Sequence, residues 1–387
     1  MTTHLVTFLT TRSQYARVQK VLECLTADDE IELDIILAGG SLVHDYGELQ
    51  DTLADAGLTV TRKLHTLLEG DEPVTQAKTT GMGLVEFASA IDNLNPDAVL
   101  TTGDRYETLA TTIATTYLNT VVVHLEGGEV TGSIDDRVRH ATTKMSDYHF
   151  VSTERSKQIV QGLGESPDRV YRTGCPSIDL CESILEDDRV DYDPQEEYGG
   201  VGPHIDTSDD YLVVQYHPLP TEYGSMYERT WELIDAVDAI DVPAFWFWPN
   251  PDSGNEQVAK AMREFRGQRE PDDAHFYVNL KPYDYLTLVS NSACVVGNSS
   301  VGIRECSYFG VPTVNIGDRQ VYRERAENVV DVPADDIKIR DAIEDQLKVG
   351  LYEGSKIYGD GTASDQITDI LRKTDLERKG SMDPSSV

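Results

Sequence analysis

The first half of the chain holds four carboxylates that could act on one substrate. They are Asp104, Glu126, Asp135 and Asp136. Asp104 and Glu126 directly follow apolar runs that have the pattern of buried strands, and Asp135 and Asp136 stand in the segment after the second of these runs. We therefore expect their side chains to meet at one edge of a sheet. Clustered carboxylates are costly unless they are paired or used, and such clusters supply general bases and general acids. A structural network of ion pairs is the alternative, because Arg137, Arg139 and His140 are interleaved with them.

Residues 295–305 carry the strongest local pattern of the second half. An apolar run ends in Gly297-Asn298-Ser299-Ser300, and a helical segment follows. Backbone N–H groups and hydroxyls at the start of a helix suit a diphosphate. Glu305, within the first turns, could accept hydrogen bonds from both ribose hydroxyls. An ordinary helix cap explains one serine, but it explains neither the second serine nor the two glycines Gly297 and Gly302. The pattern therefore predicts a nucleotide site.

Polar residues also follow the other expected strands. The residues in question are Arg12, Gly103-Asp104-Arg105, His217, Asn250 and Arg319. Ligands of open α/β sheets bind at the carboxyl ends of the strands, so these side chains are candidates for the same site. Arginines beside a diphosphate turn favour a nucleotide ligand.

The positioning elements alternate between apolar runs and amphipathic segments. We expect strands at 4–10, 33–38, 98–102, 120–125, 148–152, 169–173, 211–216, 243–248, 275–280, 293–297 and 312–316. We expect helices at 13–26, 75–94, 104–118, 153–163, 225–240, 255–267, 302–309, 335–349 and 363–373. This alternation predicts an α/β fold with parallel sheets in two Rossmann-like domains that face a cleft.

The predicted boundaries follow changes in composition. Residues 1–181 form the N-terminal domain with the carboxylates, 182–210 an acidic linker, and 211–375 the C-terminal nucleotide domain. The last helix is expected to pack back on the N-terminal domain, and 376–387 to be a flexible tail.

Composition excludes several classes of function. The chain of 387 residues has 68 acidic and 33 basic residues, a net charge of −35, which argues against nucleic acid as a partner. Acidity along the whole chain favours a protein of a salty cytoplasm. No run of about 18 apolar residues is present to span a membrane. The 5 cysteines form no Cys-x-x-Cys pair, which indicates free thiols. No Cys/His spacing predicts a metal site, and a structural metal on the carboxylates is the less favoured alternative.

Five ordered motifs make the chain resemble a known family. They are Gly103-Asp104-Arg105, His124-Leu-Glu126-Gly-Gly-Glu129, Ile134-Asp135-Asp136-Arg137-Val-Arg139-His140, Gly297-Asn298-Ser299-Ser300-x-Gly302-x-Arg304-Glu305 and Gly317-Asp318-Arg319-Gln320. They resemble the UDP-N-acetylglucosamine 2-epimerases, specifically the hydrolysing branch that opens sialic-acid-type pathways. The resemblance runs from about residue 4 to 373 and implies the GT-B fold.

The resemblance also implies roles for individual residues. Those implied for UDP binding are Arg12, Arg105, His217, Asn250, Ser299, Ser300, Glu305 and Arg319. Those implied for catalysis around the sugar are Asp104, Glu126, Asp135 and Asp136, with His217 at the diphosphate and with Arg139 and His140 near the sugar. No cofactor is implied, and a homodimer or homotetramer is expected.

The implied reaction removes the C2 proton, eliminates UDP and adds water. The product is a sugar of the N-acetylmannosamine type together with UDP. The same chemistry on UDP-2,4-diacetamido-2,4,6-trideoxyglucose, the precursor of legionaminic-type acids, is an alternative. A non-hydrolysing 2-epimerase, a GT-B glycosyltransferase and a non-catalytic nucleotide-sugar sensor are the others.

Overall fold

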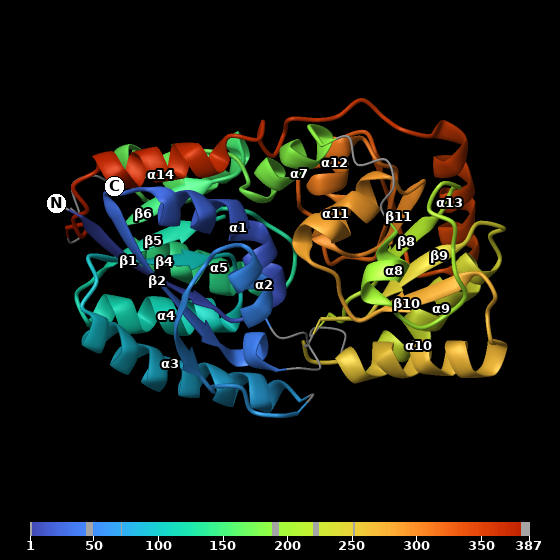
Figure 1. Ribbon diagram of the computed structural model, residues 1–387, viewed down its shortest axis with the longest axis horizontal. Helices are drawn as coiled ribbons and strands as arrows, with labels where there is room; N and C mark the ends of the chain where they lie inside the picture. Colours follow the sequence, from blue (N-terminus) through green and yellow to red (C-terminus); the bar gives the residue numbers. More distant parts are fainter. Residues whose placement is uncertain are drawn as a thin grey trace.

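The computed structural model describes residues 2–43, 49–70, 72–187, 193–219, 224–250 and 252–380. Within them the chain forms two lobes that lie side by side, each built on a parallel sheet with helices on both faces (Figure 1). In these described segments no helix is both long and apolar enough to cross a membrane.

The N-terminal lobe holds a seven-stranded sheet in the order β3-β2-β1-β4-β5-β6-β7. Its strands are β1 (Thr3–Leu9), β2 (Ile31–Ala38), β3 (Val60–Leu64), β4 (Ala98–Thr102), β5 (Val121–Leu125), β6 (Tyr148–Val151) and β7 (Val170–Arg172). Its helices are α1 (Arg12–Ala27), α2 (Gln50–Asp55), α3 (Pro73–Leu94), α4 (Tyr106–Tyr117), α5 (Asp135–Met145), α6 (Glu154–Gly162) and α7 (Ser177–Leu185). Side chains alternate along β1: Leu5 and Leu9 pack towards α1, while Val6 and Phe8 pack towards α3 and α4.

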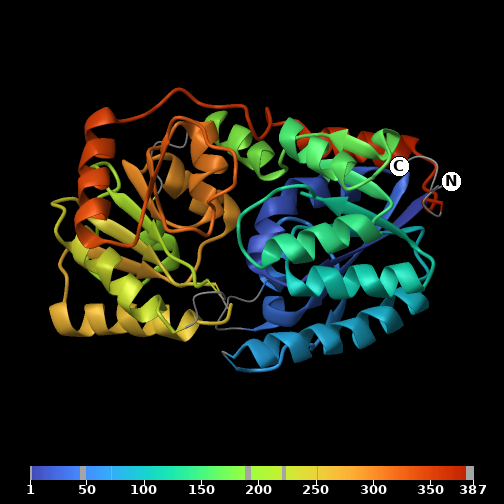
Figure 2. The same ribbon diagram turned by 180° about the vertical axis from the view of Figure 1, so that it is seen from behind.

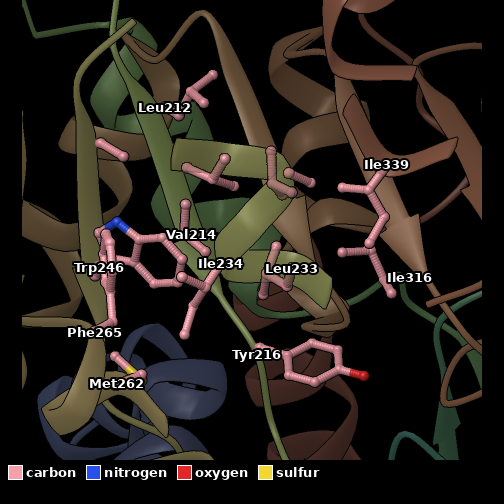
Figure 3. Packing of buried hydrophobic residues seen from close by; sticks show 14 of the residues in the cluster. Leu212, Val214, Tyr216, Leu233, Ile234, Trp246, Met262, Phe265, Ile316 and Ile339 are labelled. Carbon is pink, nitrogen blue, oxygen red and sulfur yellow. The ribbon is translucent and has the colours of Figure 1, made fainter. Parts of the chain in front are cut away.

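The C-terminal lobe holds a six-stranded sheet in the order β10-β9-β8-β11-β12-β13. Its strands are β8 (Leu212–Gln215), β9 (Ala244–Phe247), β10 (Ala274–Tyr277), β11 (Cys294–Gly297), β12 (Thr313–Ile316) and β13 (Val329–Val332). Its helices are α8 (Pro194–Tyr198), α9 (Met226–Asp238), α10 (Asn255–Arg269), α11 (Pro282–Ser290), α12 (Glu305–Phe309) and α13 (Asp336–Val349). Figure 3 shows the core between this sheet and its helices, in which Trp246 of β9 lies beside Phe265 of α10.

The strand order explains where a ligand can bind. In each sheet the order reverses beside the first strand of the lobe, between β1 and β4 and between β8 and β11. A crevice opens at such a switch point, outside the carboxyl ends of the strands. The segments after these four strands hold Arg12, Asp104, His217 and Ser299, so topology alone directs them to the cleft.

The chain returns to the first lobe at its end. Helix α14 (Ala363–Lys373) buries Ile367 and Leu371 in the core beside α1, and its course over the N-terminal lobe is visible from both sides (Figures 1 and 2). Of the expected tail 376–387, residues 376–380 are described and are held to the same lobe. There the backbone N–H of Lys379 donates to Asp147 Oδ1 over 2.8 Å.

The segment 182–210, expected as a linker, is packed over much of its described length. It begins inside α7, which buries Cys181 and Ile184 against the second lobe. Further on, Val201 pairs with Phe276 of β10. Residues 188–192 lie outside the described part. The acidic composition therefore reflects an exposed outer face and not an unattached connection.

The α/β class with two parallel sheets is confirmed, but two strands are missing from the prediction. Strands β3 and β13 are edge strands whose middle residues are exposed, so they lack the apolar run that marks a buried strand. The helix expected at 302–309 is shorter: a 3-10 turn at Ser300–Gly302 precedes α12, which ends at Phe309 and is capped by Gly310 with a φ of +78°.

Candidate functional site

A cavity of about 460 Å³ lies between the lobes and is lined by both. The first lobe contributes segments after β1 and β4 and the beginning of α5. The second lobe contributes segments after β8, β9, β10, β11 and β12. The strand ends that the sequence singled out therefore do converge on one site.

Two of the four predicted carboxylates, Asp104 and Asp135, line the cavity. Asp104 Oδ2 accepts a hydrogen bond from the guanidinium of Arg139. Ser133 Oγ donates to Asp135 Oδ2 over 2.9 Å. Burial raises the pKa of the Asp135 carboxyl, although the positive charge of Arg319 opposes the shift. A carboxylate paired with arginine and a carboxyl with a raised pKa suit the roles of general base and general acid.

Asp136 and Arg139, both expected around the sugar, lie outside the cavity lining. Asp136 Oδ1 accepts from the backbone N–H and the hydroxyl of Thr131, both at 2.8 Å, and Oδ2 accepts from the N–H of Gly132 at 2.7 Å. Arg139, which is 1% exposed, donates to Asp136 Oδ1 as well. This pair shapes the loop before α5 and orients Asp104. His140 also does not line the cavity.

Glu126 is buried behind the cavity wall and is not part of its lining. Its Oε2 accepts from Arg17 Nη1 at 2.7 Å, and its Oε1 accepts from Arg304 Nη1 at 2.9 Å. Burial would raise the pKa of this carboxyl, but the two arginines lower it to about 2. The backbone of Glu126 has a φ of +63°, which aims the residue away from the course of β5. Glu126, one of the four carboxylates expected around the sugar, thus holds two arginines that do line the cavity.

Arg17 and Arg304 were not predicted as site residues. Arg304 stands in a quoted motif, but Arg17 lies in a helix whose sequence shows no reason for a buried cation. Its partner Glu126 is 109 positions away. One indirect signal is Gly103, where an added Cβ would lie 3.1 Å from the Arg17 guanidinium. Gly103 therefore serves a close side-chain approach as well as a turn.

His217 lies in the cavity wall and is neutral. Its Nδ1 accepts the backbone N–H of Asn250 over 3.2 Å, so its proton is on Nε2. Burial and the charge of Arg319 lower the pKa of His217 to about 3. The side chain of Asn298 fixes the backbone of His217, because its Oδ1 accepts from the His217 N–H and its Nδ2 donates to the His217 carbonyl. The Nε2 N–H is left as the donor for a ligand.

The turn after β11 lines the cavity with Ser299, Ser300 and Glu305. Gly297 makes the turn possible, because an added Cβ would lie only 2.0 Å from the Gln215 carbonyl oxygen. Arg304 Nη2 donates to Ser300 Oγ over 3.2 Å. Glu305 is 5% exposed, and its Oε2 has no hydrogen-bond partner in the described structure. A buried acceptor of this kind suits a ligand hydroxyl.

Three predicted arginines, Arg12, Arg105 and Arg319, line the cavity. Arg319 Nη1 donates to the Asn298 carbonyl over 3.2 Å, which orients the guanidinium beside the Ser299–Ser300 turn. Burial lowers the pKa values of Arg12 and Arg319. Both remain cations with little solvation, which strengthens their attraction for an anion.

Part of the cavity wall is apolar and is formed by Phe247, Leu280, Tyr285 and Leu286 of the second lobe, which pack in one cluster. Tyr285 packs edge-on against Phe247, with ring centroids 5.1 Å apart, and its hydroxyl donates to Gln215 Oε1 over 2.7 Å. Aromatic walls near the Ser299–Ser300 turn and the Glu305 carboxylate could receive a nucleoside. In the part of the chain that the structure describes, no group of three or more His, Cys, Asp or Glu side chains is arranged to hold a metal ion.

Comparison with known proteins agrees with this geometry. A family model described as UDP-N-acetylglucosamine 2-epimerase matches residues 23–372. The UDP-N,N'-diacetylbacillosamine 2-epimerase (hydrolyzing) of Legionella pneumophila is 31% identical over 366 residues, 95% of this chain and 94% of that protein. The GDP/UDP-N,N'-diacetylbacillosamine 2-epimerase (hydrolyzing) of Campylobacter jejuni is 28% identical and covers 84% of this chain and 83% of its own length.

The fold also matches solved structures. The crystal structure of UDP-GlcNAc 2-epimerase from Neisseria meningitidis bound to UDP-GlcNAc superposes with a TM-score of 0.78 at 18% identity. It covers 96% of this chain and 100% of its own. This similarity confirms the expected two-domain GT-B fold.

Proposed function

The chain belongs to the UDP-N-acetylglucosamine 2-epimerase family, and we propose that it is a hydrolysing member that turns UDP-N-acetylglucosamine into N-acetylmannosamine and UDP. One observation carries the proposal: Asp104 and Asp135 line the same cavity as an anion-binding turn at Ser299. The first pair can move protons at the sugar, and the turn can hold the leaving group.

The proposed binding mode follows the chemistry of the walls. The diphosphate lies between the Ser299–Ser300 turn, His217 Nε2 and Arg319. The ribose hydroxyls bond Glu305 Oε2, which lies 3.9 Å from Arg304 Nε and accepts no hydrogen bond in the described structure, and the base lies against the apolar wall. The sugar then reaches Asp104 and Asp135 in the first lobe.

The proposed reaction begins with elimination. Asp104 takes the C2 proton, the C2–H electron pair becomes the C1–C2 double bond, and the C1–O pair leaves with UDP. His217 and Arg319 stabilise the charge that builds on the departing diphosphate. Asp135, whose pKa is raised by burial, then gives a proton to C2 on the opposite face while water adds to C1. The proton that water loses on adding to C1 goes to the carboxyl pair, and the proton first taken from C2 leaves to solvent. No electrons are gained or lost overall, so the proposal requires no redox cofactor.

A second candidate substrate has specific support. The relatives from L. pneumophila and C. jejuni carry names for the hydrolysing reaction on diacetylbacillosamine nucleotides. The C4 and C6 substituents of that sugar differ from those of UDP-N-acetylglucosamine, while C1 and C2 react in the same way. The proposed mechanism therefore serves both substrates.

The test is product analysis in D2O at high salt with each of the two sugars. Release of UDP with deuterium at C2 of a free 2-epimer is expected for at least one of them. Deuterium at C2 of an intact UDP-sugar, with no UDP released, would identify a non-hydrolysing epimerase. Turnover that depends on an added acceptor would identify a glycosyltransferase, and tight binding without turnover a sensor. Each of these three results would overturn the hydrolysing assignment.

A further inference from the structure

Arg105 connects the two lobes beside the cavity. Its Nη1 donates to Asp252 Oδ1 over 3.0 Å, from the segment after β4 to the segment after β9. Its Nε donates to Glu107 Oε2 over 3.1 Å. Glu107 is 1% exposed, so a buried carboxylate anchors the guanidinium in its own lobe while another carboxylate receives it from the opposite lobe.

Asp252 is in turn linked to the proposed diphosphate donor. Its backbone N–H donates to the Asn250 carbonyl over 2.8 Å, and the Asn250 N–H donates to His217 Nδ1 over 3.2 Å. The second of these bonds decides which ring nitrogen of His217 carries the proton. Arg105 of the first lobe is thus connected, through Asp252 and Asn250, to His217 of the second lobe. The last contact in this series sets the tautomer of His217.

We propose that Arg105 and Asp252 form a latch across the cleft and that Asp252 is a positioning residue, which acts on the bound diphosphate through His217. The inference rests on the proposed function, since it needs a diphosphate ligand. With the latch formed, the Asn250 N–H stays at Nδ1, and Nε2–H remains the donor for the ligand.

The alternative is that Asp252 only balances charge. Burial would raise the pKa of its carboxyl, but Arg105 and Arg319 hold the pKa below its ordinary value, so Asp252 is an anion in an anion-binding cavity. If it only balanced charge, its removal would strengthen the binding of UDP. The latch predicts that removal of the Asp252 charge weakens UDP binding. The direction of the change in UDP affinity therefore distinguishes the two explanations.

The experiment is a double-mutant cycle on UDP affinity, measured by titration calorimetry without turnover. We expect Asp252→Asn to weaken UDP binding about tenfold and His217→Ala to weaken it at least as much. The double variant should bind no more weakly than His217→Ala alone, because Asp252 acts through that residue. Effects that multiply to about a hundredfold, or tighter binding by Asp252→Asn, would overturn the proposal.

Two further variants complete the design. Glu256→Gln, which removes an exposed carboxylate paired with Arg263 at the start of α10, is the matched control and should leave UDP affinity unchanged. Asp252→Glu keeps the charge and should bind UDP more tightly than Asp252→Asn, and equal affinities of the two folded variants would overturn the latch. Failure of the wild type to bind UDP would reject the proposed function itself, a result distinct from failure of the latch.

Discussion

Arg304 of the second lobe and Glu126 of the first form a buried ion pair across the cleft, with 2.9 Å between Nη1 and Oε1. Arg17 of the first lobe holds the other oxygen of the same carboxylate. Breaking a buried pair leaves an uncompensated charge and costs about 3–5 kcal/mol. Glu126 therefore fixes two cations of the cavity wall at once, and its effect on a ligand is transmitted through them.

Glu126→Gln is expected to lower turnover at least a hundredfold and to weaken UDP binding about tenfold. The reason is that glutamine keeps the shape but removes the charge that orients Arg17 and Arg304. Steady-state kinetics and UDP calorimetry measure the two effects. Glu165→Gln, at a buried carboxylate paired with Lys144 away from the cavity, is the control and should leave UDP affinity unaltered. If Glu126→Gln lost turnover with UDP affinity unchanged, Glu126 would be the proton-transferring group instead.

Asp104→Asn and Asp136→Asn should separate the two neighbouring carboxylates by role. Asp104 lines the cavity, so its amide variant should lose turnover by about a thousandfold, with UDP affinity within about threefold of the wild type. Asp136 holds the Thr131 and Gly132 backbone, so its variant should lose about 1–3 kcal/mol of unfolding free energy and keep measurable turnover. Kinetics and denaturant unfolding decide the matter. The reverse pattern, with Asp136→Asn inactive and fully stable, would contradict the assignment.

The fold could be predicted from the sequence because buried strands leave local signals and the alternation of strands and helices limits the possible topologies. Buried parallel strands are continuous apolar runs, and the switch-point rule places the residues that follow them. Edge strands such as β3 escape this reasoning, since their exposed residues are polar. Asp104, His217 and Ser299 were found in this way, and the structure brings them to one cavity.

The different roles of the carboxylates could not be predicted from the sequence. Glu126 and Asp104 both stand just after buried strands, so their positions in the sequence do not distinguish their roles. What separates them is the origin of their partners. Glu126 is paired with Arg17 of α1 and with Arg304 of the other lobe, while Asp104 is paired with Arg139 of α5 in its own lobe. Long-range pairing of buried charges leaves no periodic pattern, so only the folded chain reveals it.

His217→Ala should weaken UDP binding about 10- to 100-fold, since a hydrogen bond to a charged group contributes about 1.5–3 kcal/mol. The neutral ring donates through Nε2, and alanine removes this donor without touching the backbone bonds to Asn298. His140→Ala, outside the cavity lining, should bind UDP like the wild type. Calorimetry compares them. Equal weakening in both variants would show that the loss comes from general destabilisation.

Acid should destabilise the protein through its buried neutral histidines. Burial lowers the pKa of His124 to about 4, so the folded state resists a proton that the unfolded chain accepts below about 6.5. The stability that this residue contributes is complete above pH 6.5 and is lost as pH falls towards 4. At pH 5 the loss is about 2 kcal/mol. His124→Gln should therefore lose about 2 kcal/mol less than the wild type between pH 7 and 5 in denaturant unfolding. His65→Gln, at an exposed site, should show the wild-type slope, and a slope of His124→Gln equal to it would refute the assignment.

Repulsion among the acidic residues around Asp273 should make the stability of the protein depend on salt concentration. Burial together with Asp238 and Asp272 raises the pKa of Asp273, in the segment before β10. Asp272→Asn removes one of these like charges and is expected to raise the free energy of unfolding by a few tenths of a kcal/mol at 0.1 M salt. The gain should disappear at about 1 M, where the Debye length is about 3 Å. Asp345→Asn, whose carboxylate is paired with Lys348 at 3.0 Å, is the control and should not stabilise the protein. A gain for Asp272→Asn that persisted at high salt would point to a local conformational effect and not to charge.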